Sequence, residues 1–210
     1  MLRTRMRAAV SLLAVSAVMF LVSTQVASQE KPANTDPGAD AMAEMMAKWR
    51  EINAKGPEHE RFKESVGQWE TQTLSWVAPD TKPMVSNGTA EFRLILDGRY
   101  LEQVFQGECM GEPFIGRGIE AYDRIKKKYI SIWMDNMSTS VLVLEGTADE
   151  SGRVITCLGK ADDPLTGQKD KVVKSVARQI DKDKLIFEMY DRLPDGPEYK
   201  CMEITYTRKK

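Results

Sequence analysis

Histidine is almost missing from this sequence, because His59 is the only one among 210 residues. Catalytic triads that use an imidazole base are therefore excluded within one chain, and so are metal sites built on several imidazoles. We accordingly predict no metal and no cofactor, and we assign no catalytic residue.

Cysteine is scarce as well, with three residues at Cys109, Cys157 and Cys201. Their spacing fits no metal-binding motif, and an odd number leaves at least one thiol unpaired. Oxidation of two of them is possible in an exported protein. The simplest interpretation is that all three are small buried side chains of strands.

Neither sign of charge dominates, since 30 basic residues stand against 31 acidic ones. The charges are interspersed, and no basic stripe with interleaved aromatic residues occurs, so nucleic acid is not an expected partner. The cluster at 126–128 is interpreted as a solvated turn. These features leave small molecules as the expected class of partner.

The longest uncharged apolar run, Ala8–Val22, is shorter than the roughly 20 residues of a membrane-spanning helix. Three arginines precede it, and Val26–Ser28 supplies small residues after it. This order is typical of a secretory signal peptide over residues 1–28, with a single membrane anchor as the alternative. We expect a periplasmic or secreted protein that does not contact the membrane after cleavage.

The segment after the signal peptide divides into a polar linker and two short helices. Residues 29–40 contain two prolines and no apolar period, which indicates a flexible linker. Residues 41–66 have helical spacing of apolar side chains, including a methionine-rich stripe that is expected to be a packing face.

From Gly67 to the end, at residue 210, the pattern becomes that of strands separated by turns. We count about ten strands, and no helix-length segment interrupts them. Asp97-Gly98 is a two-residue hairpin signal, and Thr139–Ala148 is one of the expected strands. The sequence therefore predicts an all-β, antiparallel up-and-down barrel, in which closure removes exposed edges.

The hairpin within Phe114–Ser140 has two chemically different faces. On its second strand, Tyr129, Trp133 and Asp135 share one face, while isoleucines occupy the other. On its first strand, Phe114, Gly116, Gly118 and Tyr122 share a face. Such strands suit a barrel wall with an aliphatic outside and a lined interior.

Closure of the barrel is predicted from the two ends of the strand region. Gly67-x-Trp69 opens the first strand and Arg208 ends the last, so antiparallel pairing should stack the guanidinium on the indole. This pairing resembles that of the calycins, the superfamily of lipocalins and fatty-acid-binding proteins.

A second resemblance covers nearly the whole strand region. It rests on Gly67-x-Trp69, Leu96-Asp97-Gly98-Arg99-Tyr100, Gly116-x-Gly118, Trp133-x-Asp135-Asn136-Met137-Ser138-Thr139, Asp163-Pro164-x-Thr166-Gly167 and Tyr206-Thr207-Arg208. Together these resemble the bacterial domain-of-unknown-function family 1579. The resemblance implies a calycin-like (lipocalin-like) barrel and brings no established activity or catalytic residue. A related barrel class binds haem through a histidine near its last strand, and Glu198–Arg208 contains none.

Our first hypothesis for function is binding of a small apolar or amphipathic molecule inside this barrel. Aromatic walls with a few polar groups are the usual composition of ligand pockets. The predicted lining is Trp76, Phe92, Phe105, Tyr122, Trp133, Asp135 and Tyr190.

Two alternatives remain open at this point. An enzyme would need two carboxyl groups inside the barrel, and Asp135 with Glu145 or Glu188 are the candidates. A structural or interaction module would instead have a filled interior. We expect that at least one of Glu145 and Glu188 faces solvent or a basic partner.

Overall fold

The computed structural model describes residues 37–164, 166–192 and 196–210. Two helices, α1 (Pro37–Ile52) and α2 (Pro57–Ser65), precede ten strands in this part of the chain. The strands are β1 (Gly67–Ser75), β2 (Met84–Ile95), β3 (Tyr100–Cys109), β4 (Glu112–Asp123), β5 (Lys128–Asp135), β6 (Leu142–Ala148), β7 (Val154–Ala161), β8 (Lys171–Asp181), β9 (Lys184–Arg192) and β10 (Glu198–Arg208).

The predicted signal peptide, residues 1–28, lies outside the described residues. The predicted linker does so up to residue 36, and residues 37–40 form the first turn of α1 instead. Proline is tolerated in that turn because its missing N–H would have no partner there. Within the described residues, no helix is both long and apolar enough to cross a membrane.

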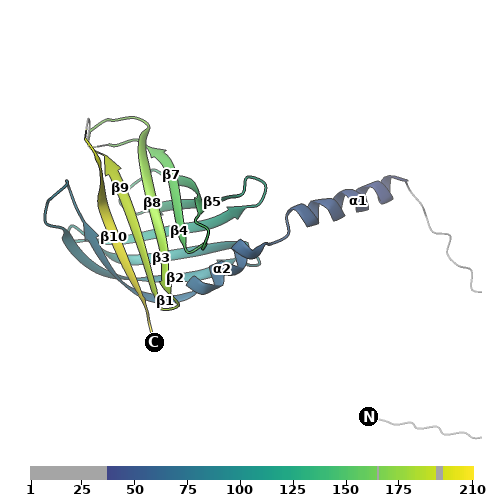
Figure 1. The fold of residues 1–210 in the computed structure, drawn as a ribbon, viewed down its shortest axis with the longest axis horizontal. Helices are drawn as coiled ribbons and strands as arrows, with labels where there is room; N and C mark the ends of the chain where they lie inside the picture. The colour runs from purple at the N-terminus through teal and green to yellow at the C-terminus, as the bar shows by residue number, and fades with distance from the viewer. Residues whose placement is uncertain (1–36, 165, 193–195) are drawn as a thin grey trace, which may run out of the picture. The chain divides into compact units, whose positions relative to one another are not determined.

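The ten strands form one closed barrel (Figure 1). Each strand pairs antiparallel with its neighbours in the chain, and β1 pairs with β10. The predicted all-β, antiparallel up-and-down barrel is therefore confirmed. The register Trp69↔Arg208 places the first and last strands side by side, so the sheet has no free edge.

The barrel has a helix end and a loop end. The helix end is where α2 leads into Gly67 and packs on β2, β3 and β4. The loop end is opposite, where the β7–β8 and β9–β10 connections lie. The predicted hairpin of β4 and β5 runs between these ends, with its turn at residues 124–127.

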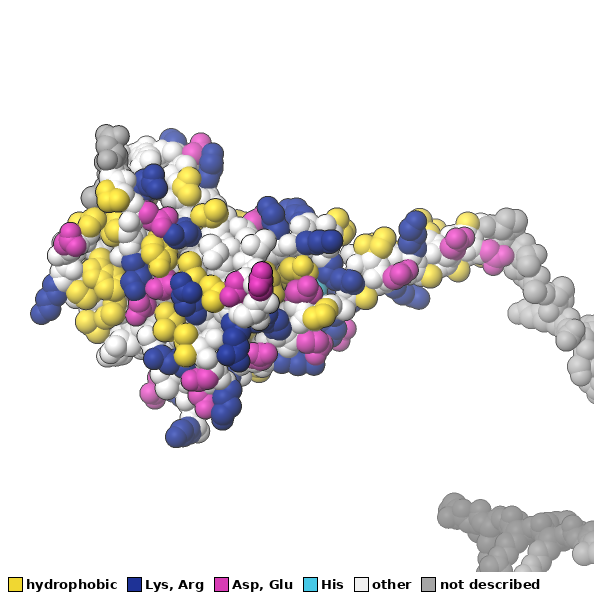
Figure 2. All heavy atoms as spheres, viewed as in Figure 1, with side chains coloured by type: hydrophobic (Ala, Val, Ile, Leu, Met, Phe, Trp, Pro, Cys, Tyr) yellow, Lys and Arg dark blue, Asp and Glu magenta, His cyan; other side chains and the backbone are white. Residues whose placement is uncertain are grey.

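Alternation along each strand separates a core-facing side from a solvent-facing side. The core contains Trp69, whose side chain is fully buried, together with Phe92, Leu101, Phe105 and Tyr206. Outside, basic and acidic side chains are interspersed over the barrel on the face shown in Figure 2. On that face, positive and negative charges are therefore mixed, and no patch carries charge of one sign alone.

The methionine-rich stripe of α1 differs from expectation. Met45, Met46 and Trp49 are exposed, with 59% of the Trp49 surface accessible. The stripe has helical spacing, but it does not pack into the barrel core, which is filled by strand residues and Phe62 of α2.

Candidate functional site

A cavity of about 150 Å³ lies inside the barrel toward the helix end. Its apolar lining includes Phe62, Phe92, Leu101, Ile155 and Phe187. Its polar lining includes Gln103, Glu120, Ser131, Cys157, Ser175 and Tyr206. The interior is therefore neither fully packed nor purely apolar.

Four polar groups of this cavity form two hydrogen-bonded pairs, one between neighbouring strands and one across the barrel. Glu120 and Ser131 are opposite each other on β4 and β5, and the Ser131 hydroxyl lies 2.7 Å from the Glu120 carboxylate oxygen. The Gln103 amide donates to the Tyr206 hydroxyl over 3.1 Å, which joins β3 to β10. The Thr71 hydroxyl, on β1 opposite Tyr206, is buried without a partner among the described residues.

Glu120 is the carboxyl group that this arrangement makes unusual. Its burial raises the pKa to about 7, and the hydrogen bond from Ser131 opposes that shift only in part. Burial also raises the pKa of the Cys157 thiol to about 12, and the charge on Glu120 adds to this. The pKa of Tyr206 is raised for the same two reasons, burial first. Near neutral pH, the thiol is therefore protonated, and it is poorly suited to act as a nucleophile.

Helix α2 covers the helix end through aromatic contacts. His59 is buried, and its ring lies edge-on to Phe62 and Tyr122, with centroids 6.0 Å from each. Its Nδ1 accepts the Gly56 N–H over 3.0 Å, which caps the helix. Burial lowers the pKa of His59, so this single histidine is a neutral packing and capping residue.

The closure contact fixes α2 to the barrel. The Arg208 guanidinium carbon lies 4.1 Å from the centre of the Trp69 ring, within the cation–π range expected from the sequence. The same guanidinium donates to the carbonyls of Glu64 and Val66, each over 2.6 Å. The Trp69 indole N–H donates to the Ser65 carbonyl over 2.9 Å. Strands β1 and β10 thus hold the carboxyl end of α2 in place.

The loop end contains an aromatic cluster that depends on Gly116. A Cβ at Gly116 would lie 2.1 Å from the Trp133 ring, so only glycine lets the indole lie flat on β4. Phe114 stacks on Trp133, with centroids 6.4 Å apart and an interplanar angle of 15°. The indole N–H donates to Asp135 over 3.0 Å. Asp135 therefore orients Trp133 and has no second carboxyl among its hydrogen-bond partners.

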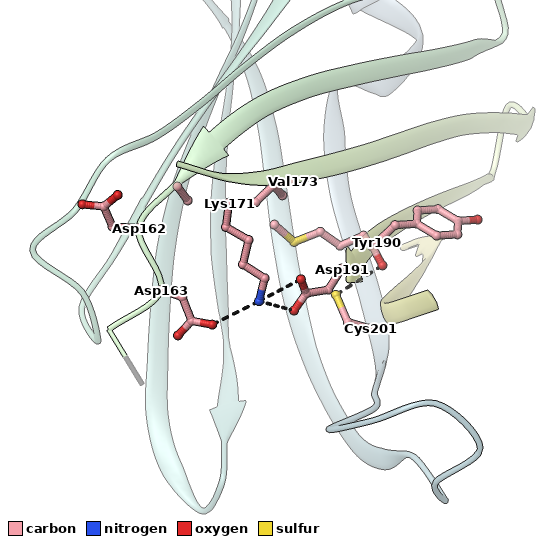
Figure 3. A pocket seen from close by; sticks show the side chains of 9 residues that line it. Asp162, Asp163, Lys171, Val173, Tyr190, Asp191 and Cys201 are labelled. Atoms are coloured by element: carbon pink, nitrogen blue, oxygen red, sulfur yellow. Dashed lines mark hydrogen bonds and ion pairs between the residues drawn. The ribbon is translucent and has the colours of Figure 1, made fainter. Parts of the chain in front are cut away.

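A second cavity, of about 190 Å³, lies at the loop end around Lys171 (Figure 3). The Lys171 ammonium contacts Asp163 over 3.0 Å and Asp191 over 2.8 Å. Partial burial alone would lower the pKa of Lys171, but these two hydrogen bonds outweigh it and raise the pKa. The positive charge of Lys171 is matched by these two carboxylates. The residues around this cavity therefore form a structural ion cluster rather than a binding site for an anion.

Five of the seven predicted lining residues lie on the inward side of their strands. They are Phe92, Phe105, Tyr122, Trp133 and Asp135. The structure divides them, because Phe92 and Tyr122 lie at the helix end and the other three lie at the loop end. Phe92 lines the 150 Å³ cavity, whereas Tyr122 supports α2.

The other two predicted lining residues are not brought into this group. Lys174 lies over the Tyr190 ring at 4.1 Å, and in Figure 3 that ring points away from the Lys171 cluster. Lys200 lies over the Trp76 ring at 5.6 Å. Tyr190 has the opposite alternation from Phe187 on β9 and lines the 190 Å³ cavity, whereas Trp76 lies one residue beyond the end of β1. Neither residue lines the 150 Å³ cavity.

The predicted carboxylate pairs are not assembled. Glu145 pairs with Lys126 and Lys128 at 3.0 and 3.7 Å. Glu188 pairs with Arg178 and Lys200, and although burial alone would raise its pKa, these bonds lower it. Both carboxylates have basic partners, as expected, so the paired-carboxylate arrangement with Asp135 is corrected.

Glu120 is the cavity-lining carboxyl group that sequence reasoning missed. It shares the alternation of Gly118 and Tyr122 on β4, and this face was already predicted to be interior. Strand period alone could therefore have placed its carboxyl inside the barrel.

Within the described part of the chain, no group of three or more histidine, cysteine, aspartate and glutamate side chains could hold a metal ion. All three cysteines are free thiols in the structure. Cys157 is buried as expected, whereas Cys109 and Cys201 are only partly buried, so the expectation was wrong for these two. The polar cavity therefore has hydrogen-bonding chemistry to offer, with Glu120 as its central ionisable group.

No curated protein matches this chain. The crystal structure of Rv2717c from M. tuberculosis is similar in fold, with a TM-score of 0.55 and 17% identity, over 74% of this chain and 99% of that one. The S-type phycobiliprotein lyase CPES from Guillardia theta has a TM-score of 0.54 and 14% identity, over 77% of this chain and 97% of that one. At sequence identities of 17% and 14%, the similarity to these two structures shows the fold alone.

The sequence itself provides the family assignment. Residues 54–208 match the family described as "Protein of unknown function (DUF1579)", and this match covers α2 and every strand from β1 to β10. Because the match spans more than half of the chain, the protein belongs to this family, as the motifs from Gly67-x-Trp69 to Arg208 had indicated.

Proposed function

We propose that this protein binds a small, partly apolar molecule inside the barrel at the helix end. The observation that carries the proposal is the 150 Å³ cavity, in which Glu120, Ser131 and Gln103 present polar atoms between apolar walls. Ligand sites typically combine an apolar lining with a few fixed polar groups.

The fold is compatible with this role. The barrel of Guillardia theta that resembles it in fold is a phycobiliprotein lyase. Small closed barrels generally have an interior that side chains fill or that holds one small ligand. Here α2 covers the helix end, so a bound molecule would be shielded from water.

Binding is tested with the purified protein in two measurements. Native mass spectrometry would detect a molecule retained from the cell, and calorimetry with benzyl alcohol would measure occupation of the cavity by a small neutral probe. Ser175→Leu, which adds volume to a buried lining position, should weaken benzyl alcohol binding. Val172→Leu, an exposed change on the same strand, is the matched control. An empty protein that also fails to bind benzyl alcohol would contradict the proposal.

We propose in addition that this binding takes place outside the cytoplasm. The support is the order of basic, apolar and small residues over residues 1–28. Intact mass of the protein from a periplasmic fraction should correspond to a chain that begins near Gln29. A full-length mass in the membrane fraction would contradict export by cleavage.

A further inference from the structure

The Glu120 carboxyl differs from the ion-paired carboxylates of this protein in having no cation beside it. Its one hydrogen-bond partner is the neutral Ser131 hydroxyl, at 2.7 Å. Among the described residues, no lysine, arginine or histidine forms an ion pair with it. Glu188, by contrast, lies between Arg178 and Lys200.

The arginines that line the same cavity are directed elsewhere. Arg178 binds Glu188 over 3.1 Å. Arg61 lies against the turn before β7, and its Nη1 is so close to Gly152 that a Cβ at this glycine would be only 1.6 Å away. Arg153 follows that turn directly. Arg153 is exposed and Arg61 and Arg178 are partly exposed, so these cations lie at the rim of the cavity. The Glu120 carboxyl lies beside Ser131, between β4 and β5.

The surroundings of Glu120 favour a ligand with one polar end. Phe92 and Leu101 supply buried apolar wall, and Gln103 and Tyr206 satisfy each other. An ionised carboxylate without a partner is unfavourable in such a place, whereas a carboxylate paired with a cation is far less so. A ligand that brings its own positive charge would supply what the protein does not.

We propose that Glu120 anchors the protonated nitrogen of a small apolar amine, whose hydrocarbon part lies against Phe92 and Leu101. This inference rests on the proposed binding function and names its ligand class. The rim arginines disfavour a second positive charge at the outer end of the ligand, so the expected class is monoamines rather than diamines.

The test compares three probes of nearly equal size by calorimetry at pH 8: benzylamine, benzyl alcohol and benzoate. A charge-assisted hydrogen bond is stronger than a neutral one, so benzylamine should bind at least about tenfold more tightly than benzyl alcohol. Benzoate should bind more weakly than either, because its charge has the sign of Glu120.

Glu120→Gln keeps the shape of the side chain and removes its charge. In this variant benzylamine should lose its advantage over benzyl alcohol. Glu145→Gln removes a carboxylate that pairs with Lys126 outside the cavity, and the preference for benzylamine should survive there. Equal affinities in the parent protein, or a preference that persists in Glu120→Gln, would overturn the inference.

A measurement on the parent protein alone covers the case in which Glu120→Gln does not fold. Benzylamine affinity should rise from pH 5.5 to pH 8 as Glu120 ionises, and benzyl alcohol affinity should not. The other ionisable groups that line the cavity are Arg61, Glu64, Tyr129, Arg153, Cys157, Arg178 and Tyr206. Arginine keeps its charge throughout, and burial raises the pKa of the thiol and of both phenols.

The two proposals fail in different ways. If benzyl alcohol binds and benzylamine has no advantage or no pH dependence, the amine inference is wrong and the binding function stands. If none of the three probes binds and native mass spectrometry finds no retained molecule, both are wrong.

Discussion

The helix end and the loop end of this barrel are closed by different interactions. At the helix end, Trp69 and Phe62 are buried, and the Arg208 guanidinium, with 25% of its side chain accessible, joins them to backbone carbonyls. At the loop end, Lys171 is held between Asp163 and Asp191, with 16–27% of these side chains accessible. Burial of aromatic rings stabilises the helix end, and at the loop end the Lys171 cluster adds partly screened charge to aromatic packing.

This difference leads to an expectation for the proposed binding function. The helix end contains the cavity with Glu120, whereas the Lys171 cluster at the loop end is partly accessible to water. We therefore expect changes at the helix end to alter both stability and binding, and changes in the Lys171 cluster to alter stability only slightly. The following four predictions test that comparison, beginning with the largest effect.

Trp69→Ala should remove about 3–5 kcal/mol from the free energy of unfolding, because it leaves a large void in a fully buried position. Trp49→Ala is the matched control, since that indole is exposed in α1, and its effect should stay within about 0.5 kcal/mol. Denaturant titration of both variants measures the difference. Similar midpoints for the two variants would contradict the assignment of the helix end as the stable one.

Glu120 should make stability fall as pH rises. The native carboxyl has a pKa of about 7 against an ordinary 4.5, so the unfolded chain loses its proton first. Between those values the unfolded state binds fewer protons, and the free energy of unfolding declines until it has lost roughly 3 kcal/mol above pH 7.

Denaturant titrations of the parent protein and of Glu120→Gln, between pH 4.5 and 8, isolate this contribution. The variant should lack the decline. Burial lowers the pKa of His59, which acts in the opposite direction at the acidic end, and His59 is the same in both proteins. Parallel pH curves for the two proteins would show that Glu120 ionises normally.

Arg208→Ala should cost about 1–2 kcal/mol, since it removes charge-assisted bonds to the carbonyls at the end of α2 and the stacking on Trp69. Arg208→Lys should lose nearly as much, because an ammonium cannot reproduce the planar fork. Thermal unfolding at fixed pH compares them. A midpoint unchanged in both variants would remove the basis for the closure contact.

Lys171→Met should have the smallest effect, about 1 kcal/mol, because its ion pairs are partly hydrated. The loss leaves Asp163 and Asp191 facing each other without the ammonium group between them. Lys169→Met, which removes only the exposed pair with Asp162, is the control. A loss as large as that of Trp69→Ala would mean that both ends are equally important.

Much of the fold could be predicted from local sequence patterns. The predictions failed where contacts with distant residues decide the structure. Strand period, turns and Gly67-x-Trp69 were sufficient for a closed barrel. The prediction of a two-residue turn at Asp97-Gly98 was wrong, because Ile95 pairs with Tyr100 and four residues lie between them. Lys55 donates a hydrogen bond to the Asp97 carbonyl over 2.7 Å. Lys55 lies 42 residues before Asp97, so the sequence of the turn itself could not reveal this contact.

The site was less accessible to sequence reasoning. Strand β9 reads Lys-Leu-Ile-Phe-Glu-Met-Tyr-Asp-Arg and is apolar on both faces, so period two did not decide whether Tyr190 faced inward. Trp76 follows the end of β1, where alternation no longer holds a side chain to one face. Strand β6 starts at Leu142 rather than Thr139, because Asn136 bonds to Ile115 and Pro113 and holds the preceding loop.

The pairing of β1 with β10 also sets the order in which this protein can be completed. The bond between Val66 and Arg208 joins positions 142 residues apart, and contacts of such separation form late and slow the folding of β proteins. Until synthesis reaches β10, β1 presents an unpaired edge to other chains. A chain that lacks its last strand is therefore expected to be an open sheet with an unpaired β1 edge, which favours association with other chains.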